Sequence, residues 1–238
     1  MRVESIVNKF AGCAAIVTGA SSGIGLAIAN MLCDNGVEVY GLGRTFRGDE
    51  AFNAVVCDLL DTKALVETIS EIMKKSDVRI LVNCAGVAYY GLHENIALSD
   101  ISSMVRTNLE VPMILSNLVL RDFKTKGNCH IINISSVTAT KAAPHGAAYG
   151  ACKSGLSAFS LSIWEEARKH GVYVTDICPD MTQTALYRNA DFTCDDDVEA
   201  HLEPEDVVAT LESVLSSREG VCVSSIKLMP KLNRIKRK

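Results

Sequence analysis

The stretch "AAIVTGASSGIGLAIANMLCDNG" (residues 14–36) determines how this chain is expected to fold. It begins with an apolar run typical of a buried strand and ends with an amphipathic helix closed by a glycine. Between them lie Gly19, Gly23 and Gly25. Glycines in such a turn permit a tight bend, close approach of the backbone to a pyrophosphate, and close packing of helix on strand. The stretch predicts a strand–turn–helix unit that binds phosphate groups at the helix start, and a plain tight turn is the alternative.

Apolar strands and amphipathic helices alternate along the rest of the chain. We expect further strands at 37–43, 53–58, 78–86, 130–135, 172–179 and 220–228, and helices at 62–76, 99–124, 147–170 and 204–217. Continuously apolar strands that alternate with helices favour a parallel sheet covered on both faces. The sequence therefore predicts one α/β domain over residues 1–238, a doubly wound Rossmann fold with about seven parallel strands, which binds its ligands beyond the carboxyl ends of the strands.

Composition and charge exclude several classes of function. The 238 residues carry a formal charge of −4, although the C-terminal tail, residues 231–238, holds five basic residues. The remainder is therefore acidic, which argues against a nucleic-acid partner. The tail either contacts an anionic surface or phosphate, or is a solvated run of charge.

The cysteines and histidines carry no signature of a disulfide framework or a metal site. Nine cysteines are scattered without a C-x-x-C pair, which favours a reducing cytoplasm. The N-terminus has no apolar leader and no stretch of about 18–20 apolar residues occurs, so we expect neither secretion nor a membrane span. The five histidines lack metal-ligand spacing, and no metal is expected.

Four motifs in order resemble the short-chain dehydrogenase/reductase family. They are "TGASSGIG" (18–25), Asn108 within "RTNLEVP", "NISS" (133–136) and "YGACK" (149–153). A Tyr-x-x-x-Lys pair alone often marks an ordinary helix surface, but Ser136 lies thirteen residues before Tyr149 as the family pattern requires. The resemblance runs from Phe10 to about Pro230 and implies a short-chain alcohol dehydrogenase or carbonyl reductase that transfers hydride between NADP(H) and a ketone or secondary alcohol.

The resemblance implies a catalytic set of Asn108, Ser136, Tyr149 and Lys153. Tyr149 would donate the proton in reduction and accept it in oxidation, and Ser136 would hold the substrate oxygen. Lys153 would bind the nicotinamide ribose and lower the Tyr149 pKa, which must fall by roughly 3 units from about 10 to reach neutrality. Asn108 would position a water that relays protons to Lys153. Ser135 is expected to be structural.

The cofactor is expected to be NADP(H), with NAD(H) possible. Gly43 stands where NAD-preferring relatives carry aspartate, and Arg44 offers a guanidinium to a 2′-phosphate, although Ser22 replaces a basic residue found in many NADP-preferring relatives. Asp58 resembles the adenine-binding aspartate, but Asp58 or Asp61 could instead cap a helix. The full expected cofactor-binding set is Gly19, Ser21, Ser22, Gly23, Ile24, Gly25, Arg44, Asp58, Leu59, Asn83, Ala85, Gly86, Tyr149, Lys153, Pro179, Thr182 and Thr184.

The substrate is left open among a sterol-like alcohol, a small aliphatic ketone and a 3-hydroxy acid. Residues 181–201 are expected to form a lid over the site, with Tyr89, Tyr90, Met181, Leu186 and Phe192 as an apolar wall. The acidic "CDDD" (194–197) argues against anionic acyl carriers and phosphorylated substrates. Asp180 replaces the usual glycine after strand six, and either occupies a backbone shape that aspartate tolerates or alters the pocket.

Two other functions compete with the enzyme. One is a non-catalytic dinucleotide-binding regulator, which binds cofactor without turnover, and the other is a scaffold that binds no nucleotide. The family usually associates through the helices after strands four and five, which implies a homodimer or homotetramer. Phe159, Leu161 and Trp164 could serve that interface or belong to the core.

Overall fold

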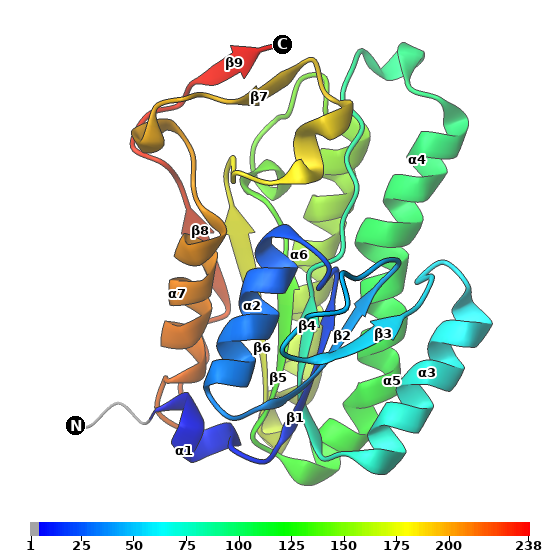
Figure 1. Cartoon of the computed structure of the whole chain (residues 1–238), viewed down its shortest axis with the longest axis vertical. Coiled ribbons are helices and arrows are strands. Elements are labelled where there is room, and N and C mark those ends of the chain that lie inside the picture. Colours follow the sequence, from blue (N-terminus) through cyan, green and yellow to red (C-terminus); the bar gives the residue numbers. More distant parts are fainter. Residues whose placement is uncertain (1–4) are drawn as a thin grey trace.

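Seven parallel strands form one sheet in the computed structural model, which describes residues 5–238 (Figure 1). The strands are β1 (Ala14–Thr18), β2 (Glu38–Gly43), β3 (Asn53–Val56), β4 (Val78–Asn83), β5 (Cys129–Ile134), β6 (Val172–Pro179) and β8 (Ser225–Leu228). The helices are α1 (Ile6–Phe10), α2 (Gly23–Asp34), α3 (Thr62–Lys75), α4 (Leu98–Val105), α5 (Val111–Lys126), α6 (Ala147–Ala167) and α7 (Pro204–Leu215). The predicted α/β Rossmann fold with seven parallel strands and flanking helices is confirmed.

The order of the strands places a crevice at the centre of the sheet. It runs β3-β2-β1-β4-β5-β6-β8, so the chain leaves β1 on one side and returns beside it with β4. In open α/β sheets, ligands bind at such a reversal, beyond the carboxyl ends of the strands. The turns that follow β1 and β4 therefore face each other across the expected binding site.

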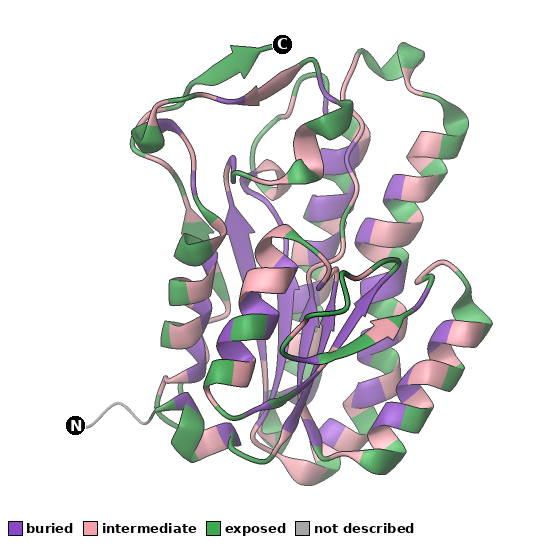
Figure 2. Ribbon diagram, viewed as in Figure 1, coloured by how far each residue is buried: buried purple, intermediate pink, exposed green. Residues whose placement is uncertain are grey.

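Apolar strands form the sheet because helices cover both of its faces. Every residue of β1 and β5 is buried, and Figure 2 shows the sheet as the buried centre of the molecule. One core packs α1, α2 and α7 against the sheet, whereas α3, α5 and the end of α6 pack on the opposite face. These continuous apolar strands are what two covered faces require.

The region expected as one helix over 99–124 is divided by a π-helical turn, Arg106–Glu110. Such turns occur mostly as single insertions in α-helices, often at functional sites. Here the turn carries Asn108, whose side chain is fully buried. Helical periodicity alone does not encode this division.

The C-terminal tail forms a strand that the sequence analysis did not predict. Strand β9 (Ile235–Arg237) pairs antiparallel with β7 (Phe192–Cys194), which belongs to the expected lid. Figure 1 shows these two strands at the end of the molecule beyond β6 and α6. The last strand of the main sheet, β8, is shorter than the expected 220–228. Within residues 5–238, no helix combines the length and apolar character that crossing a membrane demands.

Candidate active site

A cavity of about 620 Å³ opens beyond the carboxyl ends of β1, β2, β4, β5 and β6. Its size lies within the usual range for ligand sites. The lining includes the β1–α2 turn, the ends of β2 and β6, the start of α6, the lid and β9. Of the predicted catalytic and cofactor-binding residues, all except Asn83 and Asn108 line it.

The glycine turn brings bare backbone to the cavity. Gly19 has a φ of +70°, and a Cβ on it would lie 2.9 Å from the Ala85 Cα, so the turns after β1 and β4 approach too closely for a side chain. A Cβ on Gly25 would lie 2.3 Å from the Gly19 carbonyl oxygen. The N-cap residue of α2, Ser22, makes no side-chain cap hydrogen bond. The first N–H groups of α2 therefore remain available to a phosphate.

The end of β2 and the loop after β3 form one end of the cavity. Asp61 is the N-cap of α3 and accepts a hydrogen bond from the Ala64 N–H at 3.1 Å. Asp58 lines the cavity and accepts from the Leu60 N–H at 3.0 Å. Of the two residues considered for that cap, Asp61 fills it. Arg44 is exposed and also lines the cavity.

The turn after β4 is held by the hydroxyl of Thr18 and by a buried amide chain. The Thr18 hydroxyl accepts from the N–H groups of Cys84 and Ala85 at 3.0 and 3.1 Å. Asn83 donates to the Asn133 side chain at 2.7 Å, and Asn133 donates to the Ser160 hydroxyl at 2.7 Å. The structure therefore places Asn83 between strands and not on the cavity, because its amide is used to join β4 to β5 and α6.

Cys84 and Asn108 support the same turn from opposite sides. Burial raises the pKa of the Cys84 thiol to about 12, which keeps it protonated and matches the expected packing role. The Asn108 Oδ1 accepts from the Val87 N–H at 2.9 Å, and its Nδ2 donates to the Val87 carbonyl at 2.8 Å. Both ends of this amide, which the π-helical turn carries, are thus bonded to backbone. Asn108 holds the β4 turn and does not reach the cavity.

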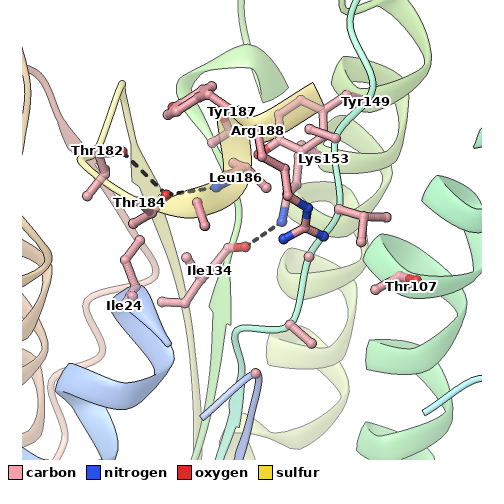
Figure 3. Close-up of a pocket in the computed structure, with 18 of the residues that line it drawn as sticks. Ile24, Thr107, Ile134, Tyr149, Lys153, Thr182, Thr184, Leu186, Tyr187 and Arg188 are labelled. Atoms are coloured by element: carbon pink, nitrogen blue, oxygen red, sulfur yellow. Dashed lines mark hydrogen bonds between the residues drawn. The ribbon is translucent and has the colours of Figure 1, made fainter. Parts of the chain in front are cut away.

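Ser136, Tyr149 and Lys153 meet where β5 ends and α6 begins. All three are buried. The Lys153 Nζ donates to the Ile134 carbonyl at 2.7 Å and lies 5.7 Å from the centre of the Tyr149 ring (Figure 3). The pair expected on one helical face is therefore found there, with the lysine fixed by the end of β5.

The pKa of Tyr149 departs from the expected direction. Burial raises it, and the hydrogen bond with Ser136 opposes that rise only in part. The Lys153 ammonium is hydrogen-bonded to the Ile134 carbonyl. Burial also lowers the pKa of Lys153. In the protein alone burial thus outweighs the group that lowers this pKa, and the predicted fall toward neutrality stays a prediction.

Ser135 has the structural role expected of it. Its hydroxyl donates to the Lys153 carbonyl at 3.1 Å and contacts the Ser157 hydroxyl at 3.0 Å. Ser157 in turn donates to the Asp176 carboxylate at 2.6 Å. These bonds fix α6 against β5 and β6, so they hold in place the helix backbone that carries Tyr149 and Lys153.

The segment after β6 closes the opposite side of the cavity. Asp180 pairs with Lys141 at 3.3 Å and accepts from the Met181 N–H at 3.0 Å, and its φ is not positive. It therefore needs no special backbone shape and instead contributes charge to the cavity rim. Thr184 caps the turn Ala185–Asn189 through the Leu186 N–H and lies against Gly23 (Figure 3).

Aromatic side chains form the wall of the substrate end. The ring of Tyr90 lies 6.0 Å from Tyr149, 6.2 Å from Tyr187 and 4.9 Å from Phe192. Tyr90, Met181, Leu186 and Phe192 line the cavity as expected, whereas Tyr89 does not. The sequence analysis missed Tyr187, although it lies within the expected lid.

The cavity lining also includes Arg188 of the expected lid and, from outside the segments expected to form the pocket, Lys141, Ile235 and Arg237. Arg188 projects from the lid into the cavity (Figure 3). Ile235 and Arg237 arrive from the tail. The sequence offers one signal for Ile235 and Arg237, an apolar residue within a run of basic residues. That signal is not enough to predict a strand. Within residues 5–238 no cluster of three or more His, Cys, Asp or Glu side chains is placed to hold a metal.

Comparisons with known proteins agree with this geometry. The family model for short chain dehydrogenase matches residues 13–194. An uncharacterized oxidoreductase of Staphylococcus haemolyticus is 29% identical over 94% of this chain and all of its own length. The 3-oxoacyl-[acyl-carrier-protein] reductase of Escherichia coli is 31% identical over 76% of this chain and 78% of its own. A metagenomic short-chain oxidoreductase solved in complex with NADP is 26% identical, with a TM-score of 0.80 over 94% of this chain and 100% of that one.

Proposed function

The chain belongs to the short-chain dehydrogenase/reductase family and is an NAD(P)-dependent oxidoreductase; we propose that it transfers hydride reversibly between NADP(H) and a ketone or secondary alcohol, with Tyr149 as acid and base. One observation carries this proposal. A protonatable phenol, a hydroxyl that hydrogen-bonds it and a buried ammonium face the same cavity as an uncapped helix start.

The residues of the cavity fit a dinucleotide. The turn of Gly19 and Gly25 excludes even a Cβ, and the N–H groups that begin α2 are not capped by a side chain, so a diphosphate finds donors without steric hindrance. Asp58 and Leu59 line the end of the cavity suited to adenosine. Lys153, Pro179, Thr182 and Thr184 line the other end, where the nicotinamide would be held.

NADP(H) is the proposed form of the cofactor. Arg44 stands exposed at the cavity after Gly43, with no carboxylate side chain at position 43 to repel a 2′-phosphate. A guanidinium matches the oxygens of a phosphate with several donors. If NADH binds at least as tightly as NADPH in a fluorescence titration, this part of the proposal fails.

When bound, the cofactor supplies or accepts the hydride, and the protein's residues manage the proton and the substrate oxygen. Ser136 donates a hydrogen bond to the carbonyl oxygen, which stabilises the charge that develops there. Tyr149 gives that oxygen its phenolic proton. Because burial keeps the pKa of Tyr149 high, the phenol stays protonated at neutral pH and is suited to the reduction. Oxidation of the alcohol uses the same residue as a base.

Lys153 and Asn108 act around this proton transfer. Lys153 is held by the Ile134 carbonyl beside Tyr149, where it would bind the ribose hydroxyls and help restore the proton. Asn108 supports the β4 turn through Val87. We propose that its part in the water relay is carried by its backbone carbonyl, because both ends of the side chain are already bonded.

A titration followed by a substrate panel tests the function. We expect NADPH to bind and at least one ketone to be reduced, with Tyr149→Phe abolishing turnover while NADPH affinity stays within about threefold. Cofactor binding without turnover of a broad ketone panel would favour the non-catalytic regulator. No binding of either nucleotide would favour the scaffold.

The assembly and the compartment are also proposals. Leu161 and Met113 are exposed apolar residues on α6 and α5, and they support association of two or four copies through these helices. Trp164 packs at the edge of the core and Phe159 is half-buried, so they contribute less. All nine cysteines are free thiols, in keeping with a cytoplasmic, reducing compartment.

A further inference from the structure

The C-terminal tail is fixed along the lid over most of its length. Arg237 of β9 stands opposite Phe192 of β7, and Ile235 stands opposite Cys194. The Leu232 N–H donates to the Glu199 carbonyl at 2.8 Å, and the Lys238 N–H donates to the Asp191 carbonyl at 2.9 Å. The backbone register therefore sets which face of the strand each basic side chain occupies.

Alternation along β9 divides its basic side chains between two faces. Lys236 pairs with Asp196 at 2.5 Å, and Arg234 pairs with Asp197. Neither Lys236 nor Arg234 lines the cavity, whereas Ile235 and Arg237 both do. This is the pattern that the two-residue period of a strand produces. The tail thus neutralises acids of the lid on one face and places Ile235 and Arg237 along the cavity on the other.

The guanidinium of Arg237 has donors to offer a ligand. No carboxylate of residues 5–238 lies within 4.0 Å of its nitrogens. Of the two acids that line this part of the cavity, Asp180 is paired with Lys141, and Asp191 forms no salt bridge with a described residue. The other lid cation, Arg188, lines the same cavity and forms no salt bridge with a described residue.

An apolar path connects the proton donor to this cation. Tyr90 lies next to Tyr149 on one side and 4.9 Å from the ring of Phe192 on the other. Phe192 is in turn the direct cross-strand partner of Arg237. A ligand with its carbonyl at Tyr149 would therefore pass apolar atoms over these rings before it reaches the guanidinium.

We propose that Arg237 binds a carboxylate of the substrate, which makes the substrate class an oxo acid, or its hydroxy acid, with apolar carbons between the two groups. A single planar guanidinium matches a carboxylate through two parallel hydrogen bonds. The acidic segment 194–197 does not oppose this, because Asp196 and Asp197 are paired with the tail. The inference rests on the proposed function for the reacting end of the substrate.

The test compares acids with their esters. The probes are 4-oxo-4-phenylbutanoate, 5-oxo-5-phenylpentanoate and 6-oxo-6-phenylhexanoate, each beside its methyl ester, with NADPH. We expect kcat/KM for the best acid to exceed that of its ester about tenfold or more, as charged hydrogen bonds allow. Arg237→Gln should remove this preference through KM for the acid, while the ester stays within about twofold.

Two matched variants distinguish binding from a general effect of charge. Lys236→Gln removes the neighbouring positive charge from the same strand and should keep the preference for acids. Arg188→Gln removes another cation that lines the cavity and should leave the ratio of acid to ester unchanged. Equal use of acid and ester by the unaltered protein, or a preference that survives Arg237→Gln, would overturn the inference while Tyr149-dependent turnover leaves the proposed function standing.

A binding measurement separates the two proposals if no ketone is reduced. Calorimetry with 4-phenylbutanoate, which has no carbonyl to reduce, reports the anion site alone in the presence of NADP. Binding that weakens at least tenfold in Arg237→Gln would support the site even if the proposed reaction failed. Binding that is equal in the two proteins would reject it.

Discussion

Substitution of Gly25 by alanine should displace the turn that is proposed to bind the diphosphate. A Cβ at this position would lie 2.3 Å from the Gly19 carbonyl oxygen and 2.7 Å from its carbon, and both atoms belong to backbone. Real contacts of this kind are not shorter than about 3.0 Å, so Gly19 must move by at least about 0.7 Å. A shift near 1 Å at a positioning group costs on the order of 100-fold. We expect NADPH affinity to fall about 10- to 100-fold.

A second helical glycine provides the matched control. In Gly155→Ala the added Cβ would lie 3.1 Å from the Leu109 Cδ2, the end of a flexible side chain. Alanine gains about 1 kcal/mol over glycine in a helix interior. This variant should therefore be as stable as the parent or more so, with unchanged NADPH affinity.

Two measurements decide the matter. Quenching or enhancement of NADPH fluorescence gives the affinity, and thermal unfolding without cofactor shows whether each variant is folded. Overpacking costs roughly 1–3 kcal/mol, so Gly25→Ala should still fold. If folded Gly25→Ala bound NADPH within about twofold of the parent, the close approach of the turns would not be what positions the cofactor.

Three further predictions concern the proton donor, a buried histidine and the tail. Because burial raises the pKa of Tyr149, the rate of ketone reduction should not change from about pH 6 to 8, whereas the rate of alcohol oxidation should rise with pH. Measuring the pH profile of each reaction checks this. An oxidation rate that falls as the pH rises would contradict it. Burial lowers the pKa of His130 to about 3, so the free energy of unfolding should be constant above pH 6.5 and should fall below it, by about 2 kcal/mol at pH 5. Urea unfolding at each pH measures this. An equal loss in His130→Phe would show that another group causes it. Deletion of residues 235–238 removes β9 and the Lys238 ammonium that donates to the Tyr187 and Ala190 carbonyls. It should therefore raise the substrate KM and speed proteolysis within residues 181–201. If the lid were cleaved as slowly as in the parent protein, the tail would not be what holds the lid in place.

The sheet and the nucleotide end of the cavity were predictable because their signals are local. Apolar strands of four to eight residues, a glycine turn and a capped helix each lie within one short window, and their order determines a parallel sheet. Ser136, Tyr149 and Lys153 were found in the same way, because a fixed spacing on one strand and one helix brings them together. A local sequence pattern was therefore sufficient to predict those site residues that one strand–helix unit carries.

Features that depend on contacts between distant segments were not predictable. The π-helical turn carries Asn108, whose amide bonds the backbone of Val87, 21 residues earlier. Asn83 faces Asn133 across two strands, and nothing in "NCAG" distinguishes that contact from one with a cofactor. The direction of the Tyr149 pKa shift depends on burial, which is not a property of spacing.

The lid and the tail show why a run of charge in a sequence does not give the charge of a pocket. Taken alone, the acids at 195–197 would repel an anionic substrate, and the tail would be a solvated basic run. Pairing β7 with β9 places Asp196 and Asp197 against Lys236 and Arg234, outside the cavity lining, and leaves Arg237 on the cavity. A slip of one residue in this register would turn Arg237 outward and Lys236 inward. The charge that the substrate meets is therefore determined by the strand register, which only the folded chain defines.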